Sequence, residues 1–247
     1  MPDRDPDRLQ RLELRLLAPQ LLPAGPAGLA WLEHYARVFD AVEVNSTFYR
    51  LARRDAVARW VGQTPEDFCF AVRASRYITH IKRLQDLSES VARFYAPLQP
   101  LVDAGKLGPV LWQLPANFHR DDARLAEALA QLPPGRHTFE FRHASWFSPE
   151  VTALLRQHGV ALAIGDRPET MFQTHEITAD FTYVRFHYGH RGRRGNYSDS
   201  ELEEWADRIV KWAGGGLDVY AYFNNDWEVF APRNALKLRK LVDRRVT

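Results

Sequence analysis

The chain has 247 residues and a formal net charge of +2 at pH 7, with 45% hydrophobic and 26% charged residues. This composition is ordinary for a globular protein, and the near-neutral charge does not mark a dedicated nucleic-acid binder. The single cysteine, Cys69, excludes an internal disulfide, and no apolar run approaches the roughly 18 residues that span a membrane.

The start of the chain is polar and carries acidic side chains, which is unlike a signal peptide. We expect residues 1–10 to be disordered and residues 12–17 to be a possible first strand. Cys69 lies in an apolar stretch and is predicted to be a buried packing residue rather than a nucleophile. Together these features predict a cytoplasmic protein that does not associate with membranes.

Seven short apolar stretches further along the chain each run directly into polar residues. They cover residues 41–45, 68–73, 110–113, 138–142, 161–166, 183–187 and 220–224. A parallel strand covered by helices should be apolar on both faces, but here one face turns polar at the carboxyl end. Barrel enzymes assemble their sites at the carboxyl ends of their strands, so the repeat predicts a functional site there.

Helical patterns with start signals lie between these stretches. Ser148 before Pro149 is typical of a helix start, Ser198 with Glu201 forms a capping box, and a further helix is predicted from Asp86 to Val102. The other predicted helices cover residues 29–39, 55–61, 121–132 and 233–242. This alternation predicts an α/β fold and one domain over residues 1–247, a TIM-type (β/α)8 barrel whose first strand is degenerate or missing.

The motifs at the strand ends resemble those of the YecE family, also called domain of unknown function 72. They are VEVNSTFY (42–49), FAVRASRYITH (70–80), GPVLWQLP (108–115), EFRHASWF (140–147) and YFNND (222–226). The resemblance covers roughly residues 29–242 and implies a TIM-type barrel. It suggests distant kinship with sugar isomerases and endonuclease-IV-like barrels, and it implies no established reaction. The family usually begins with a glycine-rich, tryptophan-containing strand, which this chain lacks before Trp31.

Charged and polar side chains at the strand ends form the predicted site. The catalytic candidates are Glu43, Glu140, Asp166 and His187. The candidates for binding substrate are Asn45, Arg73, Arg76, Lys82, Gln113, Arg142, Trp146, Arg185, Tyr222, Asn224 and Asp226. His187 is the leading acid/base candidate because histidine titrates near neutral pH, although a lone histidine is more often structural.

The acids and arginines of this set allow two interpretations. Carboxylates beside a histidine suit Mg²⁺, Mn²⁺ or Zn²⁺, so a divalent metal is possible. Three arginines on the same faces favour instead an ion-pair lattice with donors left over for a ligand, and we expect no cofactor. A pair such as Glu140 and Arg142 could also be simple charge satisfaction in the core.

Two basic segments border the predicted mouth. Residues 73–83 could bind phosphate or carboxylate or be a solvated basic loop. Residues 187–197 follow the seventh strand and could form a closing lid that contacts an anion or be a flexible loop. Trp146 and Tyr77 could stack on a sugar or base, but packing beneath a loop is the commoner role of tryptophan.

The favoured function is that of an enzyme acting on a phosphate-bearing ligand, by phosphoester hydrolysis on a nucleotide or nucleic acid. One alternative is a sugar isomerase or lyase with Glu43 or Glu140 as base, and another is a non-catalytic binder of small anions or nucleic acid. The chain carries no P-loop, dinucleotide glycine fingerprint, serine-hydrolase elbow or zinc-type Cys/His spacing. The sequence leaves the oligomeric state open.

Overall fold

The structure is a computed structural model that describes residues 28–166, 174–187, 195–225 and 230–246. Residues 1–10 and the possible strand at 12–17 therefore lie outside the described residues. Within the described ranges, no helix is long and apolar enough to cross a membrane.

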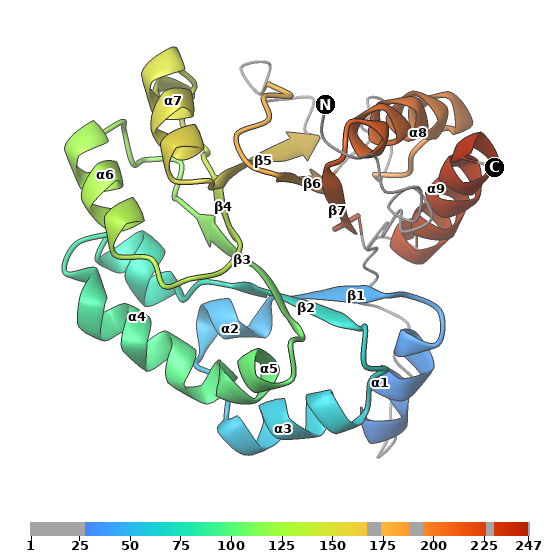
Figure 1. The fold of residues 1–247 in the computed structure, drawn as a ribbon, viewed down its shortest axis with the longest axis horizontal. Coiled ribbons are helices and arrows are strands. Elements are labelled where there is room, and N and C mark those ends of the chain that lie inside the picture. Colours follow the sequence, from blue (N-terminus) through green and yellow to red (C-terminus); the bar gives the residue numbers. More distant parts are fainter. Residues whose placement is uncertain (1–27, 167–173, 188–194, 226–229, 247) are drawn as a thin grey trace, which may run out of the picture.

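Seven strands in the described residues form one parallel sheet that curls into a nearly closed barrel (Figure 1). Each strand pairs with the next one in the chain, so the sheet order is β1 to β7. The strands are β1 Ala41–Val44, β2 Cys69–Arg73, β3 Leu107–Gln113, β4 His137–Glu140, β5 Ala161–Asp166, β6 Phe181–Phe186 and β7 Asp218–Phe223. All seven predicted strands are present, and the α/β barrel class is confirmed.

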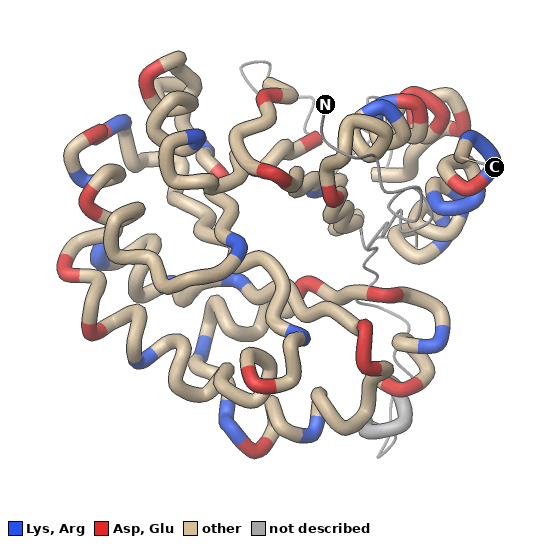
Figure 2. The backbone as a smooth tube through the Cα atoms, viewed as in Figure 1, with Lys and Arg blue, Asp and Glu red and all other residues tan. Residues whose placement is uncertain are grey.

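Helices surround the strands (Figure 1). The longer ones are α1 Gly28–Ala36, α3 Arg54–Gly62, α4 Leu87–Tyr95, α6 Asp122–Ala130, α7 Pro149–Gln157, α8 Asp199–Gly214 and α9 Phe230–Val246. Short helical segments are α2 Ser46–Tyr49, the π-helix η2 Tyr77–Ile81, η3 Ala96–Leu98, α5 Gln99–Asp103 and η4 Ala144–Trp146. Charged residues of both signs are spread over the helices and loops (Figure 2).

The predicted capping residues begin two of these helices. The Ser148 side chain accepts a hydrogen bond from the backbone N–H of Val151 at the start of α7. Ser198 and Glu201 satisfy each other's backbone donors at the start of α8, as a capping box requires.

The single helix predicted from Asp86 to Val102 is wrong, because the structure divides this stretch into α4, η3 and α5. Pro97 and Pro100 each lie in the first turn of a new segment. Proline has no backbone N–H to donate and is tolerated only in the first turn, so the chain restarts its helix at each proline.

Small residues and large aromatics in the barrel interior come from different strands. Strands β1, β2 and β5 contribute alanines together with Cys69, whereas β6 and β7 contribute four aromatic rings. The aromatic side chains are Phe181, Tyr183, Tyr220 and Tyr222. Cys69 is 4% exposed within this cluster, which confirms its predicted packing role.

Side chains connect elements that the sheet order separates. Arg239 of α9 donates to the carbonyl of Val38, at 2.6 Å, and to the carboxylate of Asp40, at 2.8 Å, just before β1. At the amino end of the strands, Arg136 donates to the Tyr220 hydroxyl at 2.6 Å and also pairs with Asp218. These contacts hold the barrel in its nearly closed form.

Candidate functional site

The carboxyl ends of the strands bring a buried ion-pair lattice together inside the barrel. We define this lattice as Glu43 of β1, Glu140 of β4, Arg185 of β6 and Arg142, which follows β4. The lattice residues alternate with side chains of the helix-facing core, such as Phe139 and Phe141, so they share the inward phase of their strands.

Arg185 lies at the centre of the lattice and contacts both carboxylates. Its Nε and Nη2 atoms donate to the two oxygens of Glu43 at 2.9 and 2.7 Å, and its Nη1 donates to Glu140 Oε2 at 2.5 Å. The Tyr183 hydroxyl donates to Glu43 Oε2 at 2.7 Å. Glu43 and Arg185 are each only 3% exposed, and the bidentate geometry is the one in which a guanidinium binds a carboxylate most strongly.

Glu140 accepts from two arginines. Besides Arg185, the Nε atom of Arg142 donates to its Oε1 at 2.7 Å. Burial alone would raise the pKa of Glu140, but the charges of Arg185 and Arg142 hold that pKa well below its usual range. The group is therefore ionised at neutral pH and unsuited to donate a proton as a general acid.

Arg73 extends the lattice toward the open side of the mouth. Its Nη2 donates to Gln113 Oε1, and its guanidinium carbon lies 3.6 Å from the centre of the Phe48 ring. Burial and the neighbouring charge of Arg185 lower the pKa of Arg73 to about 10, so Arg73 remains a cation at neutral pH.

At the mouth, the described side chains carry more positive than negative charge and leave buried hydrogen-bond donors unpaired. Three guanidinium groups, of Arg73, Arg142 and Arg185, face two carboxylates, of Glu43 and Glu140. Among the described residues, the buried Nε of Arg73 and the buried Nδ2 of Asn224 have no hydrogen-bond partner. A buried donor left unpaired is costly, so what these donors lack is a group that accepts hydrogen bonds.

The two carboxylates do not fit a divalent cation. All four of their oxygens accept hydrogen bonds from arginine or tyrosine, and the arginines already offset the negative charge that a cation would need. In the part of the chain that the structure describes, no group of three or more His, Cys, Asp and Glu side chains is placed to hold a metal ion. The contacts are those of the predicted ion-pair lattice.

Two histidines differ in their relation to the lattice. His187, just after β6, is 8% exposed, and its charge would help to lower the pKa of Glu140. His80, in η2, contacts the edge of the Phe48 ring with 4.9 Å between ring centres, and its Nδ1 lies 2.9 Å from Thr79 Oγ1. Burial, followed by the charge of Arg73, lowers the pKa of His80 to about 4, so the ring is neutral at pH 7.

The sequence pattern did not indicate a role for His80, because its segment reads as a loop. The basic segment from Arg73 to Arg83 was the available signal, since each of its arginines disfavours a second positive charge nearby.

Three predicted site residues occupy positions that argue against a direct role. Trp146 is 1% exposed, stacks on Phe141 with 4.8 Å between ring centres, and donates to the Phe118 carbonyl at 2.7 Å, which corrects the expectation that it stacks on a ligand. Tyr222 is fully buried in the barrel interior, where it pairs in register with Arg185. Asp166 shares the phase of Leu162 and Ile164, which face the helices rather than the interior.

The remaining predicted residues border the mouth or lie outside the described residues. Asn45 lies at the N-cap position of α2 without a capping hydrogen bond from its side chain, the exposed Arg76 precedes η2, and Lys82 donates to the Asp86 carbonyl at 3.1 Å. Asp226 and most of the basic segment at 187–197 fall outside the described residues.

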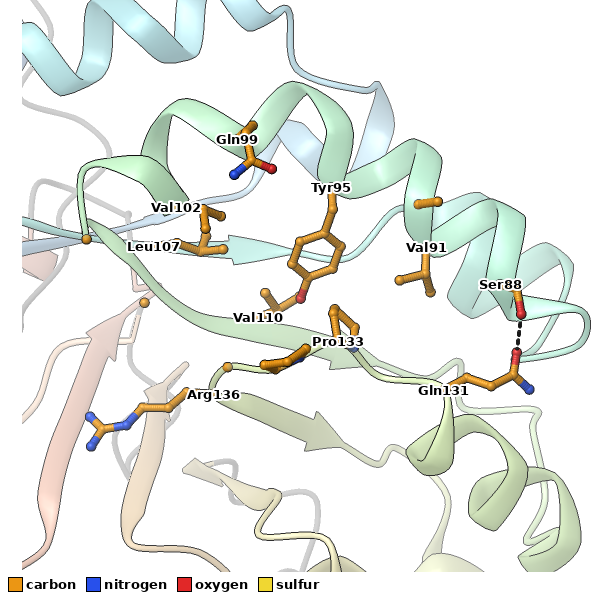
Figure 3. A pocket seen from close by; sticks show the side chains of 15 residues that line it. Ser88, Val91, Tyr95, Gln99, Val102, Leu107, Val110, Gln131, Pro133 and Arg136 are labelled. Carbon is orange, nitrogen blue, oxygen red and sulfur yellow. Dashed lines mark hydrogen bonds between the residues drawn. The ribbon is translucent and has the colours of Figure 1, made fainter.

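A cavity of about 650 Å³ lies elsewhere on the barrel, between the α4–α5 region and the segment that precedes β4 (Figure 3). Tyr95 points into it toward Val110 and Pro133, and Arg136 stands at one end. Its strand residues include Leu107 and Gly108, from the amino-terminal part of β3, so it is separate from the mouth.

The fold and the lattice define an α/β barrel protein with a polar site at the carboxyl ends of its strands. Comparison with known proteins places it more narrowly. The chain belongs to the family described as "Protein of unknown function DUF72", which matches residues 15–247, and the expected YecE-family membership is confirmed.

Among its relatives, UPF0759 protein YunF of Bacillus subtilis is 26% identical over 90% of each chain. UPF0759 protein YecE of Escherichia coli is 36% identical over 49% of this chain and 44% of its own length. The crystal structure of a DUF72 family protein from Thermotoga maritima shares the fold, with a TM-score of 0.78, 25% identity and coverage of 93% and 99% of the two chains. A xylose isomerase domain-containing protein from Salmonella typhimurium shares the barrel more distantly, with a TM-score of 0.55, 11% identity and coverage of 95% and 96%.

Proposed function

We propose that this protein is an enzyme that binds a phosphate-bearing ligand at the barrel mouth, with phosphoester hydrolysis on a nucleotide or nucleic acid as its reaction. The observation that carries the proposal is the excess of donors at the mouth. Arg73 and Asn224 each have a buried N–H group without a hydrogen-bond partner in the described residues. The mouth also carries three arginine charges against two carboxylate charges. A phosphoryl group supplies the missing acceptors and the missing negative charge.

The residues of the mouth divide into two roles under this proposal. Arg185 gives three hydrogen bonds to Glu43 and Glu140 and holds the buried base of the site, whereas Arg73 and Arg142 keep donors for the ligand. Arg142 has a side chain that is 24% exposed, so it can reach a phosphoryl oxygen from the solvent side. Fixed cations of this kind stabilise the charge that develops as a phosphoester bond breaks.

His187 is the candidate for handling the proton. It lies near Glu140, whose carboxylate stays ionised and would stabilise a protonated imidazole. Transfer of a proton by a positioned histidine is a common form of general acid–base catalysis.

The isomerase or lyase alternative is less well supported by the geometry. It requires Glu43 or Glu140 to act as base, but the oxygens of both already accept hydrogen bonds from Arg185, and Tyr183 or Arg142 adds a further one. The distant likeness to a xylose isomerase domain concerns the fold alone. A non-catalytic anion binder would use the same donors and is separated from an enzyme only by turnover.

Calorimetric titration with inorganic phosphate tests the binding site. We expect Arg73→Gln and Arg142→Gln each to weaken phosphate binding by about tenfold or more, because each removes a charge-assisted hydrogen bond worth about 1.5–3 kcal/mol. Arg156→Gln is the matched control, since Arg156 is an exposed arginine of α7 that pairs with Glu176 near the amino end of β5. Equal binding by the parent and both mouth variants would refute the phosphate site.

Turnover is tested separately with bis(4-nitrophenyl) phosphate. Release of nitrophenolate by the parent, lost in His187→Gln while phosphate still binds, would support hydrolysis with His187 as the proton carrier. Phosphate binding without turnover of this diester or of a nucleotide would favour the non-catalytic binder.

A further inference from the structure

Large apolar side chains are exposed beside the mouth, on the two short helical segments that follow β1 and β2. We define this rim as Tyr49 of α2 together with Tyr77 and Ile81 of η2, which are 75%, 51% and 62% exposed. In the part of the chain that the structure describes, these are three of the six large hydrophobic residues that are exposed. Their gathering on adjacent segments marks a surface suited to contact with another apolar group.

The rim is tied to the ligand-binding arginine by direct contacts. Thr47 of α2 donates to the Arg73 carbonyl at 2.7 Å, so α2 is fixed to the end of β2. The Phe48 ring contacts the Arg73 guanidinium on its face and the His80 ring at its edge. Tyr49 packs against Phe48 at 5.0 Å between ring centres. A ligand whose phosphate reaches Arg73 therefore lies on the side of the mouth that Phe48 and the rim border.

The π-helix η2 anchors one side and exposes the other. Ile78 and Thr79 are buried, whereas Tyr77 and Ile81 are open to solvent. Single-turn π-helices occur often at functional sites. The buried side gives η2 a fixed position, so an exposed ring on it is held ready for a ligand with little loss of conformational freedom.

Two cationic residues, Lys82 and Arg76, accompany the exposed ring of Tyr77. The Lys82 ammonium lies 5.7 Å from the centre of this ring, and the exposed Arg76 directly precedes it. A flat ring attached to a phosphate suits such a surface, because the ring stacks on tyrosine while the cations attract the phosphate. A sugar phosphate offers the charge but no flat ring.

We propose that the rim is the base-binding edge of the mouth and that the ligand is a nucleotide, with its phosphate at Arg73 and Arg142 and its base stacked on Tyr77. This inference rests on the proposed function and narrows its ligand class. Stacking on an aromatic side chain changes affinity by about 5- to 150-fold per base when the aromatic is replaced by alanine.

Binding of AMP, ribose 5-phosphate and inorganic phosphate is compared by calorimetry in the parent and three variants. We expect the parent to bind AMP at least fivefold more tightly than ribose 5-phosphate. Tyr77→Ala should lose about 5- to 150-fold in AMP affinity and keep its phosphate affinity, whereas Tyr77→Phe should keep both. Leu236→Ala is the matched control, since Leu236 is an exposed hydrophobic residue of α9. Tyr77→Leu, which keeps an apolar side chain but no ring, serves in place of Tyr77→Ala if that variant fails to fold.

The outcomes separate the two proposals. If the parent binds phosphate but binds AMP no more tightly than ribose 5-phosphate, or if Tyr77→Ala keeps the parent's AMP affinity, the base-binding edge is overturned and the phosphate site stands. If the parent binds neither phosphate nor AMP, the proposed function fails, and the inference that rests on it fails as well.

Discussion

Glu140→Gln should destabilise the protein even without a ligand. Glu140 is fully buried and accepts hydrogen bonds from Arg185 at 2.5 Å and from Arg142 at 2.7 Å. Glutamine keeps the shape but replaces one charged acceptor by an amide donor, so one arginine then faces another donor. Breaking a buried ion pair in this way costs about 3–5 kcal/mol. At this chain length about 2 °C of Tm is lost per kcal/mol, so we expect Tm to fall by about 6–10 °C.

Differential scanning calorimetry at pH 7 measures this change, with Glu150→Gln as the control. Glu150 has a side chain that is 65% exposed and pairs with Arg120 at 3.1 Å, and a surface pair of this kind contributes about 0–1 kcal/mol. The pH dependence has a definite sign, because the pKa of Glu140 is lowered on folding. Its stabilising contribution is full above the unfolded-state pKa and is lost as the pH falls through the folded-state pKa. An unchanged Tm in Glu140→Gln would refute the reasoning and leave Glu140 as a free catalytic group.

Three further predictions concern single contacts. Tyr183→Phe removes the hydroxyl that donates to Glu43 at 2.7 Å, and urea unfolding should show a loss of about 1.5–3 kcal/mol, the usual value for a hydrogen bond to a charged group; an unchanged midpoint would contradict it. The His80 ring should stay neutral down to about pH 4 in an NMR titration, and bound phosphate should raise this pKa because the anion offsets the nearby arginines; a normal pKa near 6.5 would count against the site. Gly108→Ala should destabilise the barrel by about 1–3 kcal/mol, since a Cβ atom there would overlap Cys69 Sγ, and Cys69→Ala should restore part of the loss if that overlap is the cause.

The fold and the central lattice could be predicted from the sequence because both depend on local alternation. A residue such as Glu43 or Arg185 shares the phase of its neighbours two positions away, so its direction into the barrel follows from the strand alone. The same rule explains the weak prediction at Asp166: its strand is apolar on both faces, so the pattern did not show which face turns inward.

The loops could not be predicted in this way. His80 acquires its low pKa from arginines that the fold places around it. Trp146 is buried because Phe118 and Phe141 happen to lie against it. Such contacts join segments that are far apart in the sequence and meet only in the folded protein. A loop has no repeating pattern from which these contacts could be predicted.

The contact between Glu43 and Arg185 joins β1 to β6 across the barrel, near the place where the two ends of the described sheet approach each other. The same two side chains therefore connect β1 to β6 and form the buried base of the proposed site. A variant at either position alters the shape of the mouth as well as its charge. Lost activity in such a variant would not by itself identify a chemical role, so assignments of function in this family rest more safely on residues at the edge of the lattice, such as Arg73 and Arg142.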